Sequence, residues 1–282
     1  MNTSFSPKLP QAGSTSGRKL WIGIGLGVLA SFMLMCGLLL LGFNFLRPRL
    51  SAEARFVEVS AACTKLYEES KFDEAIEACS EAIALKPNSI DAYITRGYIA
   101  LTRRQYDKAL ADFDQALHYD PNNGQAFINR GITYARMGDI DKTIANYDEM
   151  LSRDIQNSTH RYYGYNNRGL AYDNKGDVDH AIQDYVHAIQ EQTSLLDAYD
   201  NLEGIFLREK SQSELIDTYN GLVQQYPENP EILFRRGTIY RRMGQFDHAM
   251  EDFEESLTLH PSDQLKSKIH TQIHDIKPLV EQ

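Results

Sequence analysis

Prolines recur in this sequence at a regular spacing, and this period constrains the fold more than any other feature. The interval from Pro87 to Pro121 equals the interval from Pro227 to Pro261. The stretch between Pro121 and Pro227 is three of these periods plus four residues, and we assign the extra four to Ser158–Arg161. A fixed period of about 20 to 50 residues indicates a solenoid, in which each repeat packs on its neighbours. The sequence divides into six repeats: 56–89, 90–123, 124–157, 162–195, 196–229 and 230–263.

Small and aromatic residues return at fixed positions, counted from the first residue of each repeat. Position 8 is glycine in four repeats: Gly97, Gly131, Gly169 and Gly237. Position 20 is alanine in four: Ala75, Ala109, Ala181 and Ala249. Position 24 is aromatic in five: Phe113, Tyr147, Tyr185, Tyr219 and Phe253. This pattern resembles the tetratricopeptide repeat family, in which each repeat is a pair of antiparallel helices, A and B. Two helices approach closely only where neither carries a bulky side chain, and rings then fill the space beside the contact.

The resemblance implies an all-α fold, a right-handed superhelical solenoid of six helix pairs over residues 51–263. Glycine at position 15 is expected to end helix A in a left-handed conformation, at Gly138, Gly176 and Gly244. Residues 264–282 are predicted to contain a capping helix that ends at Pro278. Its apolar residues follow a helical stripe: Leu265, Ile269, Ile273 and Ile276.

Two places depart from the regular repeat. The fifth repeat has Glu203 at position 8 and Leu215 at position 20, so its two helices are predicted to lie further apart. Between the third and fourth repeats, Ile155 replaces the proline and four residues are inserted. The solenoid is therefore predicted to bend or slip at this junction.

Arginine at position 7 occurs together with a polar residue at position 23. The pairs are Arg96 with Asp112, Arg130 with Asn146, Arg168 with Asp184, and Arg236 with Asp252. The two repeats without the arginine have Ala62 with Ala78 and Leu202 with Thr218. We predict that each arginine contacts its partner across the hairpin and sets its register, with little effect on stability where the pair is exposed.

The first repeat carries Cys63 at position 8 and Cys79 at position 24, both facing the interface between helices A and B. A total of three cysteines does not suit a disulfide framework. The favoured interpretation is two buried thiols that act as small apolar fillers. The alternative is a disulfide across the first hairpin, in an oxidising compartment.

The segment from Leu20 to Leu46 includes no Asp, Glu, Lys or Arg. About 20 apolar residues suffice to cross a bilayer, so residues 20–46 are predicted to form a single-pass transmembrane helix that contacts lipid. A cleaved signal peptide is the alternative, but its apolar core is shorter, at roughly 7–15 residues. Gly23 and Gly27 offer a small-residue surface for an anchor dimer. The flanking bases nearly balance and favour a cytoplasmic N-terminus, with the repeats on the exported side.

The net charge of −10 combines two unlike parts of the chain. Residues 1–50 contain five bases and no acid, whereas residues 51–282 contain all 39 acids and the other bases, so this part is the more acidic one. Nucleic-acid binding needs basic patches, so nucleic acid is disfavoured as a partner. Residues 1–19 are rich in Ser, Gly, Pro and Thr and are predicted to be a disordered basic tail.

No catalytic motif is present in the sequence: there is no Walker loop, H-E-x-x-H, G-x-S-x-G or C-x-x-C. His270 and His274 are spaced one helical turn apart, but no acidic third ligand stands in a matching motif. We therefore expect a protein that is not an enzyme and that has no metal and no cofactor.

The family resemblance implies a concave groove lined by helix A, which binds segments of other proteins. Predicted groove residues are an apolar stretch (Ile94, Tyr98, Ile132), a ladder of amides (Asn129, Asn167, Asn201) and a basic end suited to an acidic segment (Arg235, Arg241, Arg242). We expect a non-enzymatic, membrane-anchored scaffold, such as an assembly or tethering factor for a membrane complex. The alternative is a permanent structural subunit that packs through its anchor and convex face.

Overall fold

The computed structural model describes residues 51–209 and 211–281. The chain divides into two units, Met1–Ser51 and Ala52–Gln282. The described part of the second unit consists of thirteen α-helices and contains no strand. Their bounds are α2 (Ala52–Glu68), α3 (Phe72–Leu85), α4 (Ile90–Thr102), α5 (Tyr106–Tyr119), α6 (Gly124–Met137), α7 (Ile140–Ser152), α8 (Ser158–Lys175), α9 (Val178–Glu191), α10 (Asp197–Glu209), α11 (Gln212–Gln225), α12 (Pro230–Arg242), α13 (Phe246–Thr258) and α14 (Asp263–Val280).

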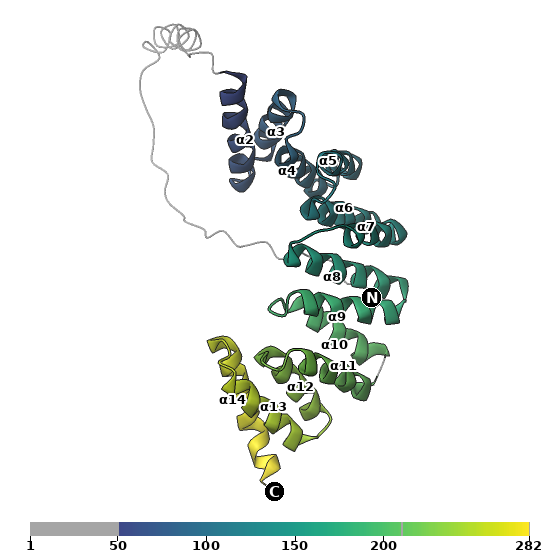
Figure 1. The fold of residues 1–282 in the computed structure, drawn as a ribbon, viewed down its shortest axis with the longest axis vertical. Helices are drawn as coiled ribbons and strands as arrows, with labels where there is room; N and C mark the ends of the chain where they lie inside the picture. The colour runs from purple at the N-terminus through teal and green to yellow at the C-terminus, as the bar shows by residue number, and fades with distance from the viewer. Residues whose placement is uncertain (1–50, 210, 282) are drawn as a thin grey trace, which may run out of the picture. The chain divides into compact units, whose positions relative to one another are not determined.

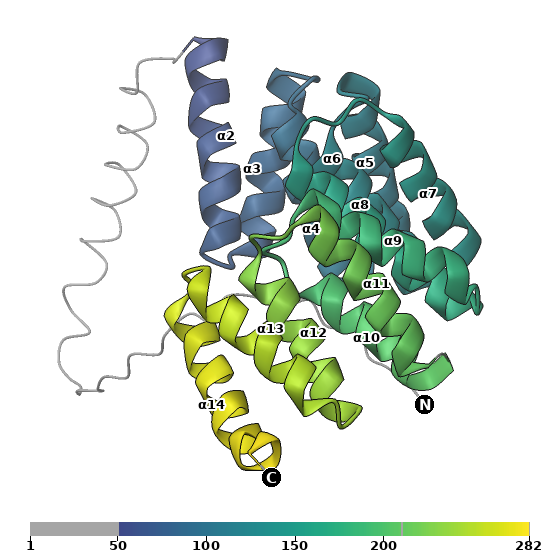
Figure 2. The same cartoon turned by 60° about the horizontal axis from the view of Figure 1, so that its bottom comes forward.

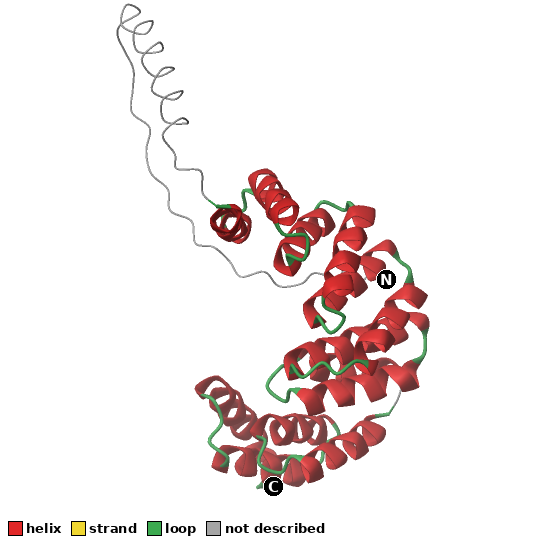
Figure 3. Ribbon diagram, turned by 45° about the horizontal axis from the view of Figure 1, so that its top comes forward, coloured by secondary structure: helices red, strands yellow, loops and turns green. Residues whose placement is uncertain are grey.

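The helices form six consecutive hairpins, followed by α14. The even-numbered helices from α2 to α12 are the A helices of the six repeats, and the odd-numbered helices are the B helices. Each B helix also packs against the A helix that follows it, so the hairpins of the second unit stack in chain order (Figures 1 and 3). A glycine ends α6, α8 and α12 as predicted, with φ of 80°, 83° and 74° at Gly138, Gly176 and Gly244.

Glycine at position 8 leaves space for the ring at position 24. A Cβ built on Gly97 would lie 2.8 Å from the ring of Phe113, and one on Gly237 would lie 2.7 Å from the ring of Phe253. Both rings are fully buried. The helices of these hairpins therefore come together through a ring that covers a glycine.

Arginine at position 7 ties three helices together. Arg96 donates from Nε (2.9 Å) and Nη2 (2.7 Å) to the carboxylate of Asp112, the predicted partner, and from Nη1 to Ser80 Oγ (2.9 Å). Ser80 belongs to helix B of the preceding repeat, at position 25. The pattern recurs with Arg130 on Asn146 and Asp114, Arg168 on Asp184 and Asp148, and Arg236 on Asp252 and Asn220. Each arginine therefore joins successive repeats in addition to closing its own hairpin.

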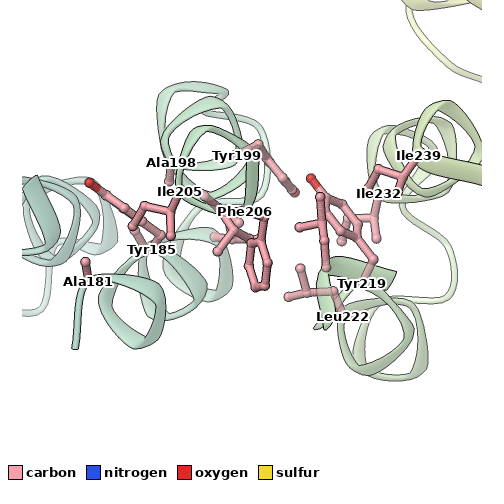
Figure 4. Close-up of a cluster of buried hydrophobic side chains, with 14 of the residues drawn as sticks. Ala181, Tyr185, Ala198, Tyr199, Ile205, Phe206, Tyr219, Leu222, Ile232 and Ile239 are labelled. Atoms are coloured by element: carbon pink, nitrogen blue, oxygen red, sulfur yellow. The ribbon is translucent and has the colours of Figure 1, made fainter. Parts of the chain in front are cut away.

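The fifth repeat is built differently because Glu203 stands in place of glycine. As predicted, α10 and α11 approach each other less closely than the helices of the other hairpins. Tyr219 OH donates to Glu203 Oε1 at 3.1 Å, and the Tyr219 ring lies 6.5 Å from that of Tyr199 in a buried cluster (Figure 4). Glu203 also accepts from Arg235 Nη1 (3.0 Å) and Arg242 Nη2 (2.9 Å). The carboxylate thus connects the fifth repeat to the sixth.

Cys63 in α2 and Cys79 in α3 form a disulfide, with their Cα atoms 4.8 Å apart. Both residues are buried. The bridge occupies the place where other repeats set a glycine against a ring. The favoured interpretation as two separate thiols is therefore wrong, because residue spacing does not reveal the direction in which each sulfur points.

The four inserted residues form the first turn of α8. This helix has 18 residues, whereas α4 and α6 have 13 and 14. Asn157 caps it by accepting a hydrogen bond from the backbone N–H of His160 at 2.9 Å. Ile155, which stands where proline was expected, is buried. The insertion thus lengthens one helix, and α8 still packs on α6 and α7.

The last helix, α14, covers the end of the array. It packs against α13 and α12 (Figure 2), with Leu265, Ile269 and Ile276 buried as the apolar stripe predicts. The helix continues through Pro278 to Val280, so the prediction that proline ends it is wrong. Pro278 lies in the last turn of the helix, so the backbone hydrogen bond that it lacks and the crowding of the carbonyl before it affect only the helix end.

None of the helices in the described part of the chain is long and apolar enough to cross a membrane. The predicted span at 20–46, its Gly23 and Gly27 surface, and the predicted tail at 1–19 all lie outside the described residues.

Candidate functional site

The predicted apolar groove residues lie on neighbouring A helices. Ile94 and Tyr98 belong to α4 and Ile132 to α6, and all three are half-buried. Ile94 and Ile132 pack against the same buried cluster between the second and third repeats. The ring of Tyr98 meets that of Tyr67 edge-on, with centroids 5.7 Å apart. These side chains therefore leave only part of their surface for a partner.

The predicted amide ladder is engaged inside the solenoid. Asn129 is buried, with 3% of its surface exposed, and its Oδ1 accepts from Gln125 Nε2 at 3.1 Å. Asn167 Nδ2 donates to Tyr147 OH at 3.2 Å, across the joint of the third and fourth repeats. Asn201 Nδ2 donates to Asn166 Oδ1 at 3.0 Å, across the next joint. In this structure the amides of Asn167 and Asn201 connect repeats to one another.

The predicted basic end is neutralised by acids of the same chain. Arg235, only 11% exposed, donates to Glu231 (2.7 Å), Asp200 (2.9 Å) and Glu203 (3.0 Å). Burial by itself lowers the pKa of Arg235, but the neighbouring Tyr219, Glu203 and Glu231 outweigh burial and raise it above its usual range. The guanidinium therefore stays charged and paired.

The two remaining arginines of this end are also paired. Arg242 donates to Glu203 at 2.9 Å, and Arg241 donates to Asp275 of α14 at 3.2 Å. The prediction of a basic surface free to hold an acidic segment is therefore corrected. The acids that neutralise it come from two neighbouring repeats and the capping helix, and their proximity depends on how those elements stack.

A pocket of about 590 Å³ opens beside the A helices of the first to fourth repeats. Its wall includes groove residues of α2, α4 and α6, two turns that connect a B helix to the next A helix, and the first turn of α8. The lining residues are Thr64, Asp91, Ile94, Thr95, Asp120, Asn122, Asn123, Gly124, Gln125, Asp154, Ile155, Gln156, Asn157 and His160. Its volume lies within the range of about 300–1,000 Å³ that is typical of ligand sites.

The charges of this pocket are all acidic. Asp91, Asp120 and Asp154 line it, and no Lys or Arg stands among its lining residues. Asp120 accepts hydrogen bonds from the Asn122 backbone and the Asn123 side chain, both at 3.1 Å. Asp154 accepts from the side-chain amide of Gln156. The hydrogen bonds of Asp120 and Asp154 come from neutral donors and leave the negative charges uncompensated.

His160 forms one side of the pocket, against the start of α6. A Cβ on Gly124 would lie 2.5 Å from His160 Nδ1, so the imidazole rests directly on the glycine backbone. Burial lowers the pKa of His160, which favours the neutral ring at neutral pH. The histidine thus adds no positive charge to the pocket at that pH.

Within the described residues, no group of three or more His, Cys, Asp or Glu side chains is placed to hold a metal ion. His270 and His274, the pair noted in the sequence, both lie on the exposed face of α14.

Sequence reasoning identified only Ile94 among the residues that line the pocket. The acids at 91, 120 and 154 are far apart in the sequence and belong to no motif. One signal was available, because the four-residue insertion that interrupts the period supplies the turn that carries His160.

Three segments of the chain match family models described as tetratricopeptide repeat: residues 90–123, 162–193 and 230–263. They coincide with the second, fourth and sixth repeats of the sequence period. No curated protein matches the chain.

Solved structures with a similar fold include PilF from Pseudomonas aeruginosa, with 13% identity and a TM-score of 0.54, covering 78% of this chain and 99% of that one. Another is PilW, described as a widely conserved type IV pilus biogenesis factor, with 17% identity and a TM-score of 0.50, covering 76% of this chain and 98% of that one. At such identities the similarity concerns the fold alone. The described residues form an all-helical solenoid that contains tetratricopeptide repeats.

Proposed function

We propose that this chain is a non-enzymatic scaffold that holds a segment of another protein on the A-helix side of its solenoid. The observation that carries this proposal is the pocket of about 590 Å³, which is lined by residues from four successive A helices, α2, α4, α6 and α8, and the turns beside them. A site built from several repeats suits an extended or helical segment better than a small substrate.

The proposal includes anchoring through residues 20–46, which rests on the sequence alone. A membrane-anchored scaffold of this kind could assemble or tether a membrane complex, and we include this role in the proposal. PilW is described as a pilus biogenesis factor, and this chain is similar to it in fold.

The disulfide between Cys63 and Cys79 supports a location for the repeats. Disulfides persist in oxidising compartments and are rare in the cytosol. We therefore place the repeats on the exported side of the membrane, with the N-terminus in the cytoplasm. Alkylation of the chain isolated without reductant, followed by peptide mass mapping, tests this. Cys63 and Cys79 should resist alkylation, and full labelling of both in unfolded but unreduced protein would refute the placement.

Site-specific photo-crosslinking tests the binding function. A photoreactive amino acid in place of Tyr98, on the groove side of α4, should give one dominant adduct whose crosslinked peptide maps to a defined segment of one protein. The matched control places the same group at Glu77, which is exposed on helix B of the first repeat. Equal adducts at both positions would argue for the alternative, a structural subunit that packs through its convex face.

A further inference from the structure

We propose that the pocket beside the first to fourth repeats receives a lysine or arginine side chain from the bound segment of the partner protein. This inference rests on the proposed function, since it names the chemistry of the segment that the scaffold holds. We call this site, lined by Asp91, Asp120, Asp154, Ile94 and His160 among others, the acidic pocket.

Charge complementarity is the first argument. The acidic pocket has three carboxylates and no Lys or Arg in its lining. The nearest arginines in the sequence are used elsewhere: Arg153 pairs with Glu149 at 2.7 Å, and Arg161 pairs with Glu191 at 2.7 Å. A cationic side chain would therefore supply a countercharge that the lining residues do not.

The helix ends around the pocket do not reverse this charge. The N-termini of α4, α6 and α8 lie at its edge, and each carries a partial positive charge of about half a unit. One N–H group at the start of α6 and one at the start of α8 already donate to side chains, those of Asn123 and Asn157. Three full negative charges outweigh these partial charges, so the pocket favours a cation over an anion.

The shape of the lining suits a long basic side chain. Half-buried Ile94 provides apolar surface, while the carboxylates of Asp91 and Asp154 belong to residues exposed to solvent. Lysine and arginine lay their aliphatic stems on apolar surface and keep the charged head among polar groups. One side chain of this kind can therefore use both parts of the lining at once.

The inserted turn of α8 makes this pocket specific to one joint of the solenoid. Among the four extra residues, His160 lines the pocket, beside Asp154 to Asn157 of the preceding turn. Gly124 accommodates the imidazole because a side chain at this position would collide with it. The break in the sequence period thus contributes one wall of the pocket, at His160.

Selection from a displayed random heptapeptide library on the immobilised full-length chain, in mild detergent, tests the inference. We expect the selected peptides to be enriched in Lys or Arg, and their affinity to fall with rising salt. The double variant Asp91→Asn/Asp154→Asn should bind them about tenfold more weakly. The matched control, Asp107→Asn/Asp247→Asn, removes two exposed first-turn acids of B helices and should bind within about twofold of the wild type.

The outcomes separate the inference from the proposed function. If no peptide is selected, both are overturned. If the selected peptides lack basic residues, or bind the Asp91→Asn/Asp154→Asn variant as tightly as the wild type, the inference is overturned. The proposed scaffold function would then still stand. Two further results would also overturn the inference: tight binding of inorganic phosphate in the pocket, or competition by a synthetic peptide of residues 1–19, which would make the chain's own basic tail the occupant.

Discussion

Two residues with side chains, Ser70 and Arg104, adopt the left-handed backbone that the turn between helices A and B requires. Position 15 is glycine in three repeats, but in the first two it is Ser70 and Arg104, with φ of 60° and 59°. The left-handed conformation costs a residue with a side chain about 1–2 kcal/mol. The geometry of the turn therefore persists even where the residue type disfavours it.

Glycine at these two positions should stabilise the solenoid. We expect Ser70→Gly and Arg104→Gly each to raise the free energy of unfolding by about 0.5–1 kcal/mol, because relief of strain exceeds the entropy that glycine adds to the unfolded chain. Gly138→Ala is the reverse control: nothing lies within 4 Å of its Cβ position, so only strain would change and stability should fall. Urea unfolding measures all three, and a loss of stability in both glycine variants would contradict the account.

Tyr185 and Tyr147 occupy the same position of successive repeats but differ in their hydroxyl groups. Tyr147 OH accepts from Asn167 and donates to the Ile128 carbonyl at 3.3 Å. Tyr185 OH is buried and has no hydrogen-bond partner among the described residues. Burial raises the pKa of Tyr185 far above its usual range, so its hydroxyl stays protonated.

Removing the two hydroxyls should therefore have opposite effects. Tyr185→Phe should raise the free energy of unfolding by about 1 kcal/mol, because it removes an unsatisfied buried group, whereas Tyr147→Phe should lower it by a similar amount. Urea unfolding of both variants checks this. Equal losses in the two variants would show that the Tyr185 hydroxyl has a partner in solution.

At the scale of a single helix, the extra turn of α8 carries His160, whose titration makes the stability of the folded chain depend on pH. Burial lowers the pKa of His160, so between that pKa and the unfolded value of about 6.5 the folded chain binds fewer protons than the unfolded chain. The contribution of neutral His160 to the free energy of unfolding is therefore fully present above a pH of about 6.5, and it is lost as the pH falls below that value.

Replacing the histidine should remove this dependence. We expect His160→Gln to lose less stability than the wild type when thermal unfolding is compared at pH of about 7.5 and about 5. The difference between the two curves isolates His160 from the other titrating groups. Parallel curves for the two proteins would show that the imidazole titrates alike in the folded and unfolded chains.

At the scale of the whole solenoid, each repeat contacts mainly its neighbours, so stability is close to a sum of local terms. The joints differ in kind. Arginine at position 7 links the second, third, fourth and sixth repeats each to the repeat before it. The fifth repeat has Leu202 there, and Asn201 joins it to the fourth repeat through Asn166. Glu203 and Arg235 add a further link between the fifth repeat and the sixth. The first repeat, at the start of the array, is closed by the Cys63–Cys79 disulfide.

Reduction of that disulfide should act locally. A bridge that closes a loop of about 15 residues contributes about 3 kcal/mol, so amides of α2 and α3 should exchange with solvent much faster after reduction. Amides of α12 to α14 should exchange at unchanged rates, because several repeats separate them from the bridge. Hydrogen exchange of the native chain with and without reductant measures this, and faster exchange throughout the array would show a single cooperative unit instead.

Much of the fold follows from the sequence, and little of the candidate site does. The repeat boundaries, the glycine-to-ring contacts and the stripe of α14 were predictable because each depends on residues a fixed number of positions apart. The pairing of Arg235 with Asp200 and Glu203, and the gathering of Asp91 and Asp154 around one pocket, were not. These contacts join residues that are distant in the sequence, and no local pattern marks them.

The sequence by itself determined the repeat period, the hairpin in each repeat and the place where the period breaks, because small side chains at fixed spacings dictate where two helices touch. The tertiary structure decided which long polar side chains remain available to a partner. An arginine or asparagine on an A helix can reach several acceptors, and the one it uses depends on how closely the next repeat stacks. Stacking occupied Asn201 and Arg235 and left the carboxylates of the acidic pocket without a countercharge.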